Sequence, residues 1–523
     1  MKKIICNVWL ITGLVFGMNA TTNAQINTIR FDTTFGTNGI LSNSAPQNYN
    51  EAMCDMAIQA DGKIVVAGSS GNAGRGPTVI RFLSTGVVDS TFGTAGYVYL
   101  DQPYDIGSTA GAVKLISNGR MLVSGCDDAN YNGFMNYFVA RLDSTGALDT
   151  TFGTEGYTYF KKGKRLLPPQ MVLLADGSVI SEYPIANSQS ALFKVDSNGV
   201  ADNSFGVNDS LLITELSIVS SIKLDNNGNI LVAGSVSDTS AFGIVRLLPN
   251  GQRDNTFGNN GLGLYSYYDS SSSGYIGGES PIPVVEPNGD ILVSFIISTS
   301  SDIVATMRLF QNGTVDGSYG KDGGVLSLTY AQLDDVLLMP NDELVIAGTF
   351  SVNDYISPLA DVAVITNSGR LDTVFPRGAA SIVFALDTSA TNTISTPSTL
   401  RLLPDNKLLL GGAAEPSLST IAFARFNYTG FVTTGIAQPA PVGDMQLYPN
   451  PANSYAVIQY PLNEWGAARV NVFDMLGNLV LQSTISGQPS VYRVDATRLV
   501  NGVYTIEIRS GQQVATRKLV VQH

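Results

Sequence analysis

Histidine is almost absent from this sequence of 523 residues, because the single one, His523, is the last residue. Without an internal histidine the chain cannot build a Ser-His-Asp triad, a Cys-His pair or a histidine-based metal site within its fold. It also has no P-loop and no dinucleotide-binding fingerprint. The composition does leave open glycoside hydrolysis by paired carboxylates.

Cysteine and charge are scarce as well. Cys6 lies in the N-terminal leader, and Cys54 and Cys126 have different spacings from their nearest turns. We therefore expect no disulfide between them, because a disulfide needs Cα atoms within about 7 Å. Charged residues make up 14% of the chain, and the net charge is −13. An acidic surface repels phosphate backbones, so we expect no nucleic-acid partner.

One long apolar run is present, at the N-terminus. Lys2 and Lys3 precede the apolar stretch 4–18, and Thr22-Asn23-Ala24 suits a cleavage site. This pattern predicts that residues 1–24 are a signal peptide. No later stretch is long and apolar enough to cross a bilayer, so we expect the mature protein to have no membrane span.

Glycine (53 residues), tyrosine and phenylalanine (22 each) are abundant, and many of them belong to an internal repeat. One phrase, Asp-x-Thr/Ser-Phe-Gly with two weaker copies, recurs about every 60 residues. Its aspartates are Asp32, Asp89, Asp149, Asp202, Asp254, Asp316 and Asp372. A second phrase, an Asx-Gly-like turn followed by an apolar run, also occurs seven times, for example as Asp61-Gly62-Lys-Ile-Val-Val-Ala-Gly68.

These two phrases predict strands joined by tight turns. Asx-Gly is a strong hairpin signal, because both turn positions then take a positive φ. The apolar run after it is typical of a strand that is buried on both faces. A second glycine turn, for example at Gly86, adds another hairpin. Four strands in about 57 residues match one propeller blade.

The two ends of the array predict a closed ring. The chain enters the repeat half-way, at Phe31-Asp32, and the last repeat stops at Thr429-Gly430 without its second half. A ring whose closing blade takes strands from both ends explains this arrangement and removes exposed sheet edges. We therefore predict an all-β chain with a seven-bladed β-propeller over residues 25–432. The alternatives are an open β-solenoid or a string of small sandwiches.

The repeat phrases DGKIVVAG and RLDSTGALDTTFGTEG resemble the delta-60 repeat family of bacterial exported proteins. The resemblance covers about residues 31–430 and implies a propeller. It implies no particular activity.

A basic residue precedes the second turn glycine by five positions in six repeats, and Val364 replaces it in the other. The repeat aspartate follows the same glycine by three positions, so a cross-strand Arg–Asp contact is within reach. A contact repeated in every blade favours a structural role over a ring of ligand-binding charges.

Two loops offer candidate ligand contacts. The loop Asp128-Ala-Asn130-Tyr-Asn132-Gly133 resembles the first half of a calcium loop, but Val139 takes the place of the acidic twelfth residue, so a polar loop without metal is the alternative. We expect no cofactor apart from this candidate calcium ion. Aromatic side chains that could stack on sugars or contact a protein are Tyr131, Phe134, Tyr137, Tyr265, Tyr267 and Tyr268. Packing between the blades is the alternative for them.

The pattern changes after a linker at residues 433–443, which is rich in Pro, Gly and small residues. Short alternating strands in the remaining residues, 444–523, predict a small β-sandwich of the immunoglobulin type. Its motifs, in order, are Tyr448-Pro449-Asn450-Pro451, DMLGN around Gly477, Gly502-Val-Tyr504 and a terminal KLVV. They resemble the type A sorting domain of type IX secretion cargo; a plain Ig-like module is the alternative.

That resemblance implies the type IX secretion machinery as a partner and a path through the periplasm to the cell surface or the medium. We expect a non-enzymatic propeller that binds an unknown protein or glycan at a loop-lined face. The alternative is a glycan hydrolase or lyase that uses carboxylates on the same ring.

Overall fold

The computed structural model describes most of the chain between residues 29 and 523. The described ranges are 29–43, 50–71, 76–100, 108–127, 134–164, 168–185, 189–206, 210–236, 241–269, 274–276, 278–297, 302–321, 323–329, 332–350, 359–372, 381–386, 395–414, 420–428, 446–459, 468–473, 479–485, 491–510 and 513–523. The chain divides into two compact units, Met1–Gly430 and Phe431–His523. The predicted signal peptide and linker lie outside the described residues.

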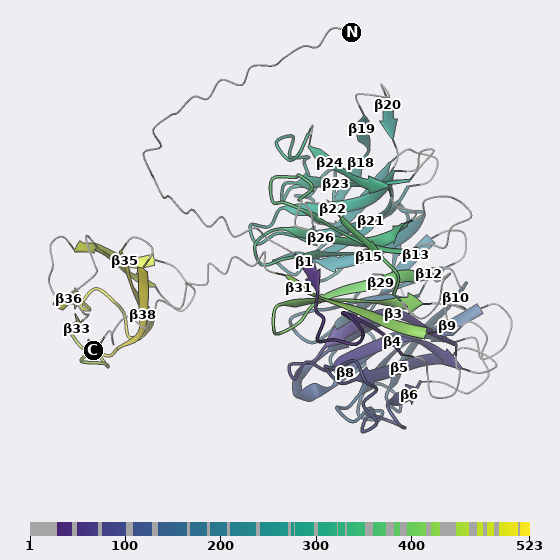
Figure 1. The fold of residues 1–523 in the computed structure, drawn as a ribbon, viewed down its shortest axis with the longest axis horizontal. Coiled ribbons are helices and arrows are strands. Elements are labelled where there is room, and N and C mark those ends of the chain that lie inside the picture. The colour runs from purple at the N-terminus through teal and green to yellow at the C-terminus, as the bar shows by residue number, and fades with distance from the viewer. Residues whose placement is uncertain are drawn as a thin grey trace, which may run out of the picture. The chain divides into compact units, whose positions relative to one another are not determined.

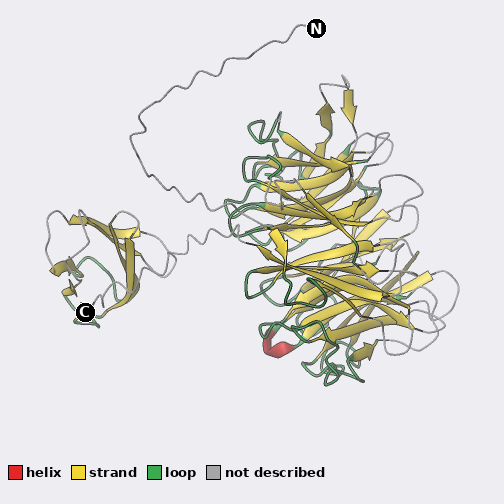
Figure 2. Ribbon diagram, viewed as in Figure 1, coloured by secondary structure: helices red, strands yellow, loops and turns green. Residues whose placement is uncertain are grey.

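The first unit is built from antiparallel sheets (Figures 1 and 2), six of which are four consecutive strands. We number these sheets as blades 1 to 6, each from its innermost strand outward. Blade 1 is β3 (Asn50–Ile58), β4 (Ile64–Gly71), β5 (Gly76–Phe82) and β6 (Tyr97–Tyr99). Blade 2 is β7 (Thr109–Leu115), β8 (Met121–Asp127), β9 (Phe134–Leu142) and β10 (Tyr157–Lys164). Blade 3 is β11 (Gln170–Leu173), β12 (Val179–Ile185), β13 (Gln189–Val195) and β14 (Ser210–Ile213).

Blades 4 to 6 repeat this order. Blade 4 is β15 (Ile218–Leu224), β16 (Ile230–Ser235), β17 (Phe242–Leu247) and β18 (Leu262–Tyr265), and a small hairpin, β19 (Tyr267–Asp269) and β20 (Gly274–Ile276), follows it. Blade 5 is β21 (Gly278–Val285), β22 (Ile291–Ile297), β23 (Ile303–Leu309) and β24 (Gly324–Thr329). Blade 6 is β25 (Gln332–Leu338), β26 (Leu344–Phe350), β27 (Leu359–Ile365) and β28 (Ser381–Phe384).

The remaining sheet, the closing blade, takes strands from both ends of the unit. Its inner strands are β29 (Ser395–Leu402), β30 (Lys407–Ala414) and β31 (Thr420–Tyr428), and β1 (Ile29–Phe31) and β2 (Ile40–Asn43) both pair with β31. Arg30 lies opposite Asn427, and Leu41 lies opposite Phe423. Figure 1 shows β1 beside β31. The N-terminal segment therefore supplies the strands that the last repeat lacks.

The innermost strands close a circle. Each contacts the innermost strand of the next blade, in the order β3, β7, β11, β15, β21, β25 and β29, and β29 contacts β3 again. Apolar clusters fill the spaces between sheets; one of them joins Met53 and Met56 of blade 1 to Leu409 and Phe423 of the closing blade. The all-β propeller prediction is confirmed, and an open solenoid is not what the contacts show.

The inner hairpin turns differ from the prediction in one detail. Among the inner hairpin turns that the structure describes, only Asn118-Gly119, within the short 3₁₀ element η1 (Ser117–Gly119), has two successive positive φ values. In blade 1 the turn is one residue longer: the amide of Gly62 donates to the carbonyl of Gln59, and only Gly62 has a positive φ. This is the type I turn with a left-handed last residue, which also matches strand twist.

The second unit is a β-sandwich, as predicted. One sheet holds β32 (Gln446–Tyr448), β33 (Tyr455–Gln459) and β36 (Val491–Asp495). The other holds β35 (Leu479–Ile485), β34 (Ala468–Phe473), β37 (Gly502–Ser510) and β38 (Gln513–Val521). Its core contains Ile458, Val472, Ile506 and Leu519. No helix in the described part of the chain has the length and hydropathy of a membrane span.

Candidate functional site

The repeated Arg–Asp pair joins neighbouring blades. In blade 1, Arg81 Nε donates to Asp89 Oδ2 at 2.8 Å, and Arg81 Nη1 donates to the carbonyl of Ser144 in blade 2 at 2.7 Å. Asp89 Oδ1 in turn accepts from the amide and hydroxyl of Thr91. The arginine therefore fixes its own turn and the turn of the next blade at once. We call this set of contacts the blade clamp.

The aromatic residue of the phrase completes the clamp. Phe92 is fully buried, with Arg81 over its ring at 4.5 Å. Its ring lies against Gly146 of the next blade, where a Cβ atom would come within 2.9 Å of the ring, and the amide of Gly93 donates to the carbonyl of Thr145. Equivalent pairs are Arg141–Asp149, Lys194–Asp202, Arg246–Asp254, Arg308–Asp316 and Arg425–Asp32. This arrangement favours a structural role for the repeated aspartates.

The exception is blade 6, where Val364 replaces the basic residue. There the amide of Asp372 still donates to the carbonyl of Val364, so the turn itself is kept. Among the described thiols, Cys54 and Cys126 form no disulfide, as expected.

Two of the aromatic ligand candidates are wrong. Tyr137 is fully buried in the cluster between blades 2 and 3, and Tyr265 is buried between blades 4 and 5, where its hydroxyl donates to the carbonyl of Gly313. Rings that are packed between blades cannot stack on an external ligand. Tyr131 lies outside the described residues; the side chains of Phe134, Tyr267 and Tyr268 do so as well.

The candidate calcium residues Asp128, Asn130 and Asn132 also lie outside the described residues. Elsewhere, in the ranges that the structure describes, no three acidic, cysteine or histidine side chains come together in a way that could hold a metal ion.

The described residues contain a polar site that the motifs did not predict, at the innermost strands. Asp55 on β3 and Asp335 on β25 each directly follow a β-bulge. Asp55 Oδ2 accepts from the amide of Val113 in blade 2 at 3.1 Å, and Asp335 Oδ2 accepts from the amide of Leu400 in the closing blade at 2.8 Å. Because bulges re-aim side chains, each carboxylate caps a backbone donor of the next blade.

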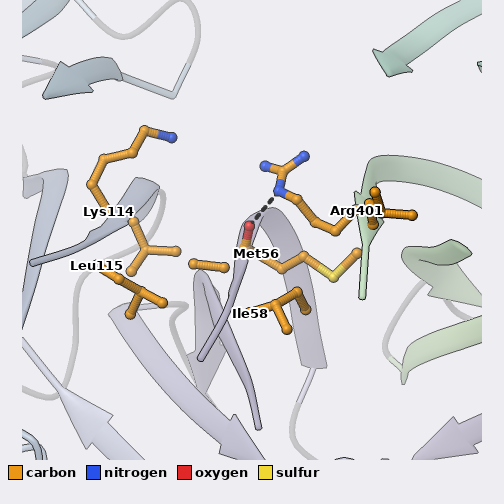
Figure 3. A pocket seen from close by; sticks show the side chains of 8 residues that line it. Met56, Ile58, Lys114, Leu115 and Arg401 are labelled. Atoms are coloured by element: carbon orange, nitrogen blue, oxygen red, sulfur yellow. Dashed lines mark hydrogen bonds between the residues drawn. The ribbon is translucent and has the colours of Figure 1, made fainter. Parts of the chain in front are cut away.

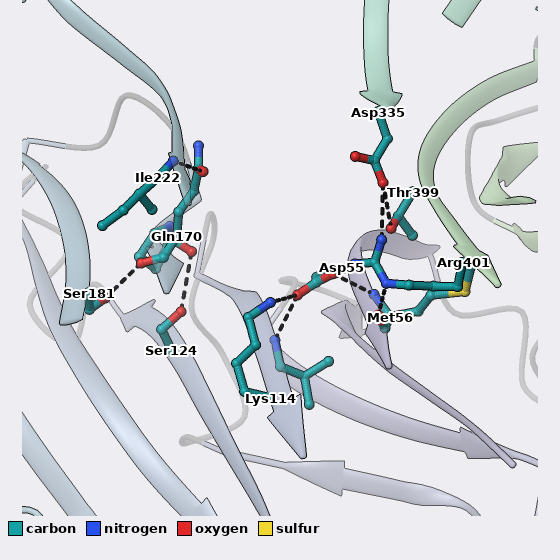
Figure 4. Close-up of polar contacts among 12 residues, drawn as sticks. Asp55, Met56, Lys114, Ser124, Gln170, Ser181, Ile222, Asp335, Thr399 and Arg401 are labelled. Atoms are coloured by element: carbon teal, nitrogen blue, oxygen red, sulfur yellow. Dashed lines mark hydrogen bonds and ion pairs between the residues drawn. The ribbon is translucent and has the colours of Figure 1, made fainter. Parts of the chain in front are cut away.

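Two cations bind these carboxylates. Lys114 Nζ lies 3.1 Å from Asp55 Oδ2. Arg401 Nη1 lies 3.0 Å from Asp335 Oδ2, its Nη2 donates to Asp55, and its Nε donates to the carbonyl of Met56 at 2.7 Å. Figure 4 shows Asp55 between Lys114 and Arg401, with Asp335 beyond Arg401. The network thus joins blade 6, the closing blade and blades 1 and 2 across the ring closure.

The balance of charge keeps this network ionised. Burial alone would raise the pKa of Asp55, but Lys114 and Arg401 and the amide of Val113 outweigh it and lower that pKa. Burial would likewise lower the pKa of the Arg401 guanidinium, and the two aspartates raise it instead. The side chains of Lys114 and Arg401 remain 33% and 28% exposed, so neither is fully enclosed by the network.

A pocket of about 310 Å³ opens beside these cations. Figure 3 shows Lys114 and Arg401 on either side of Met56. The pocket is lined by Met56, Ala57, Ile58, Val113, Lys114, Leu115, Arg401 and Leu402. Its walls come from β3, β7 and β29, at the ends of the strands that lead into the inner turns. It is an apolar pocket with two cations.

A third cation, Lys223 on β15, lies at the same register as Lys114 and Arg401, opposite a leucine on the second strand in each case. Among the residues that the structure describes, Lys223 has no hydrogen-bond or ion-pair partner. Burial lowers its pKa; Asp335 and Asp55 oppose this shift, and Lys114 and Arg401 add to it. These influences place Lys223 in the same electrostatic environment as the network.

Blade 3 holds a buried acid. Glu182 on β12 is 2% exposed, at a position where the other repeats have Ala67, Ser124, Ala233, Ser294, Ala347 and Gly411. Burial raises the pKa of Glu182 from 4.5 to about 7, although hydrogen bonds with Ser190 and the Gln170 backbone oppose the rise. The folded protein therefore binds more protons than the unfolded chain between these two values.

We predict that Glu182→Gln removes a pH dependence of stability. The free energy of unfolding of the wild type should fall as the pH rises from 4.5 to 7, because the folded state must release a proton there. The variant should be more stable at pH 8 by up to roughly 3 kcal/mol, and about equal at pH 4.5. Urea unfolding followed by circular dichroism at both pH values measures this. Equal pH slopes for the two proteins would contradict the prediction.

In the sandwich, one of the predicted sorting residues, Asn450, binds the last strand through its side chain. Asn450 Nδ2 donates to the carbonyl of Lys518 at 2.7 Å, and the amide of Val520 donates to Asn450 Oδ1. Asn450 lies between Pro449 and Pro451, and Tyr448 before them is 45% exposed. The hydroxyl of Tyr504 donates to the carbonyl of Val500, two residues before Gly502. Gly477 lies outside the described residues.

Two family models match the chain. One, described as a secretion system C-terminal sorting domain, matches residues 446–522. The other, described as a domain of unknown function (DUF5122) beta-propeller, matches residues 59–92, 116–152 and 226–257. No curated protein matches the sequence.

Several solved structures are similar in fold. A protein of unknown function from Dyadobacter fermentans is 11% identical over 76% of this chain and 99% of its own, with a TM-score of 0.41. The propeller domain of the Trilobed protease from Pyrococcus furiosus is 8% identical (78% and 97% covered, TM-score 0.32). The intramolecular trans-sialidase from Ruminococcus gnavus is 12% identical (74% and 97% covered, TM-score 0.35). At these identities and TM-scores the likenesses carry no argument about function.

Proposed function

We propose that this chain, a DUF5122-type β-propeller that ends in a secretion system C-terminal sorting domain, is an exported binding protein whose ligand enters the pocket between Lys114 and Arg401. The sorting domain indicates export by the type IX secretion system. The part that remains to be assigned is what the propeller does once it is outside.

The observation that carries the proposal is the combination of an apolar pocket and two partly exposed cations at the ring closure. Ligand pockets are typically about 300–1,000 Å³, mostly apolar, and contain a few convergent polar groups. The pocket at Lys114 and Arg401 has about 310 Å³ and this composition. The two aspartates nearby are bound to these cations and to backbone amides, so they support a binding surface better than a pair of catalytic carboxylates.

An array that carries both glycans and peptides tests the proposal with the full chain. Leu115→Trp should fill the pocket, because Leu115 is one of its walls. Leu173→Trp is the matched control, since Leu173 lies at the same register of β11 and lines no part of the pocket. We expect array ligands to be lost with the first variant and kept with the second, and none of them to be cleaved. Ligands that bind Leu115→Trp as well as the wild type would overturn the proposal.

Export itself gives a separate prediction. A chain that ends after Gly443 lacks the sandwich and should accumulate in the periplasm of the native host, because residues 446–522 supply the sorting domain. Cell fractionation with an antibody against the propeller measures this, and the full chain is the control. Normal export of the shortened chain would show that the sandwich is not the sorting signal.

A further inference from the structure

We infer that the ligand of the Lys114–Arg401 pocket is a peptide segment that carries a carboxylate beside apolar side chains, and that Lys223 helps to hold the carboxylate. This inference rests on the proposed function, because it names the ligand class of the same pocket. It is carried by the hydrogen-bond donors that the network leaves unused and by the chemistry of the pocket walls.

The unused donors point to an anion. Arg401 donates four hydrogen bonds from its five N–H groups, to Met56, Leu400, Asp335 and Asp55. Lys114 uses one of the three N–H donors of its ammonium group to bind Asp55. Lys223 donates no hydrogen bond to any of the described residues. The free donors of three cations therefore gather at one level of the ring interior, whereas both carboxylates are occupied.

The excess of positive charge at this site contrasts with the rest of the chain. The protein as a whole carries a net charge of −13, yet three cations face two carboxylates here. An additional anion would complete the pairing, and burial at the ring interior strengthens each contact relative to water. Lys223 would gain most from this anion, because it has no ion-pair partner among the described residues.

The walls favour a peptide over a glycan. The lining holds six apolar side chains, no aromatic ring and no neutral polar side chain. A sugar carries hydroxyls all around its ring, and those that face the six apolar side chains would lose hydrogen bonds to water without replacement. Leucine-like side chains would instead bury apolar surface against Met56, Ile58 and Leu115. A carboxylate next to such side chains fits both features of the pocket.

Calorimetric titration of the full chain tests the inference with matched peptides. The first pair is acetyl-Leu-Asp-Leu-amide and its Asn analogue, which probe a side-chain carboxylate. The second is acetyl-Leu-Leu with a free carboxyl end and its amide, which probe a chain terminus. We expect at least one acid to bind about ten-fold more tightly than its uncharged partner, the size of one effective ion pair. Trigalacturonate is the carboxylated glycan in the comparison.

The variants locate the effect. Lys223→Met should abolish the preference for the acid, Lys223→Arg should keep it, and Lys321→Met, at an exposed turn residue, should leave it unchanged. Equal binding of acid and amide, or Lys223-dependent binding of trigalacturonate without peptide binding, would overturn the peptide assignment. If array ligands still require an open pocket in either case, the proposed function stands and this inference alone fails. If no array ligand is sensitive to Leu115→Trp, the proposed function fails first.

Discussion

Asp32→Ala should release the N-terminal strands of the closing blade. Asp32 is buried, and its carboxylate lies 2.8 Å from Arg425 Nε and 3.0 Å from Lys407 Nζ. Burial alone would raise the pKa of Asp32, but the Thr34 hydroxyl and the two cations outweigh it and hold that pKa well below its usual range. Loss of one partner of a buried ion pair costs about 3–5 kcal/mol. Here the loss falls on a short terminal segment that can detach by itself.

Hydrogen exchange at the Arg425 amide measures this opening, because that amide donates to the carbonyl of Gly39 in the N-terminal segment. A loss of about 3 kcal/mol should speed its exchange on the order of 100-fold. Asp89→Ala is the matched control: Asp89 has the same contacts, with Arg81 at 2.8 Å and Lys63 at 3.4 Å, within a continuous stretch of chain. It should leave exchange at Arg425 unchanged. Equal acceleration by both variants would show that the N-terminal segment does not close the ring.

Arg401→Met should destabilise the propeller by about 3–5 kcal/mol. The variant removes the cation that Asp335 and Asp55 share and leaves two buried carboxylates under-compensated. The contribution of Asp55 is fully present above its ordinary pKa of 3.8 and is lost as the pH falls through its lowered pKa. The difference between variant and wild type should therefore shrink toward pH 2. Urea unfolding followed by circular dichroism suits this measurement. Tryptophan fluorescence would not report on the propeller, because neither of the two tryptophans of the chain lies between residues 25 and 432.

Lys223→Met is the control for this effect. It makes the same kind of change at the same register of another blade, but Lys223 has no ion-pair partner among the described residues. Burial of an unpaired ammonium is unfavourable, so this variant should be as stable as the wild type or more so. If Lys223→Met costs as much as Arg401→Met, general packing and not the ion-pair network would explain both losses.

The architecture could be predicted from the sequence because the same turn and strand signals recur in every repeat. Most blades contain their own turn glycines, apolar strand and clamp, so the pairing of Arg81 with Asp89 could be inferred from spacing alone. The closing blade could be predicted for the same reason. Asp32 and Phe35 belong to a clamp at the N-terminal end of the propeller, and the arginine of that clamp, Arg425, lies at the C-terminal end.

The pocket could not be predicted in this way, because it depends on residues that differ between repeats. Lys114, Lys223 and Arg401 occur at one register, whereas Ala57, Val284 and Leu337 occupy it in other blades. The available signal was a basic residue at the second-to-last position of three inner strands. The aromatic candidates failed for a related reason: rings such as Tyr137 and Tyr265 are the right size to fill the spaces between blades, and sequence alone does not separate that role from ligand contact.

The closure of the ring by β1 and β31 underlies the whole account, because Arg401, Asp55 and Lys114 meet only if the closing blade lies beside blade 1. Arg30 and Asn427 are opposed across this strand pair, and both are exposed. The Arg30→Cys/Asn427→Cys double variant, oxidised under mild conditions and digested for mass spectrometry, tests this directly. We predict a disulfide between these two positions in the folded, monomeric chain. Two free thiols at these positions in folded protein would contradict the closed ring and the site built on it.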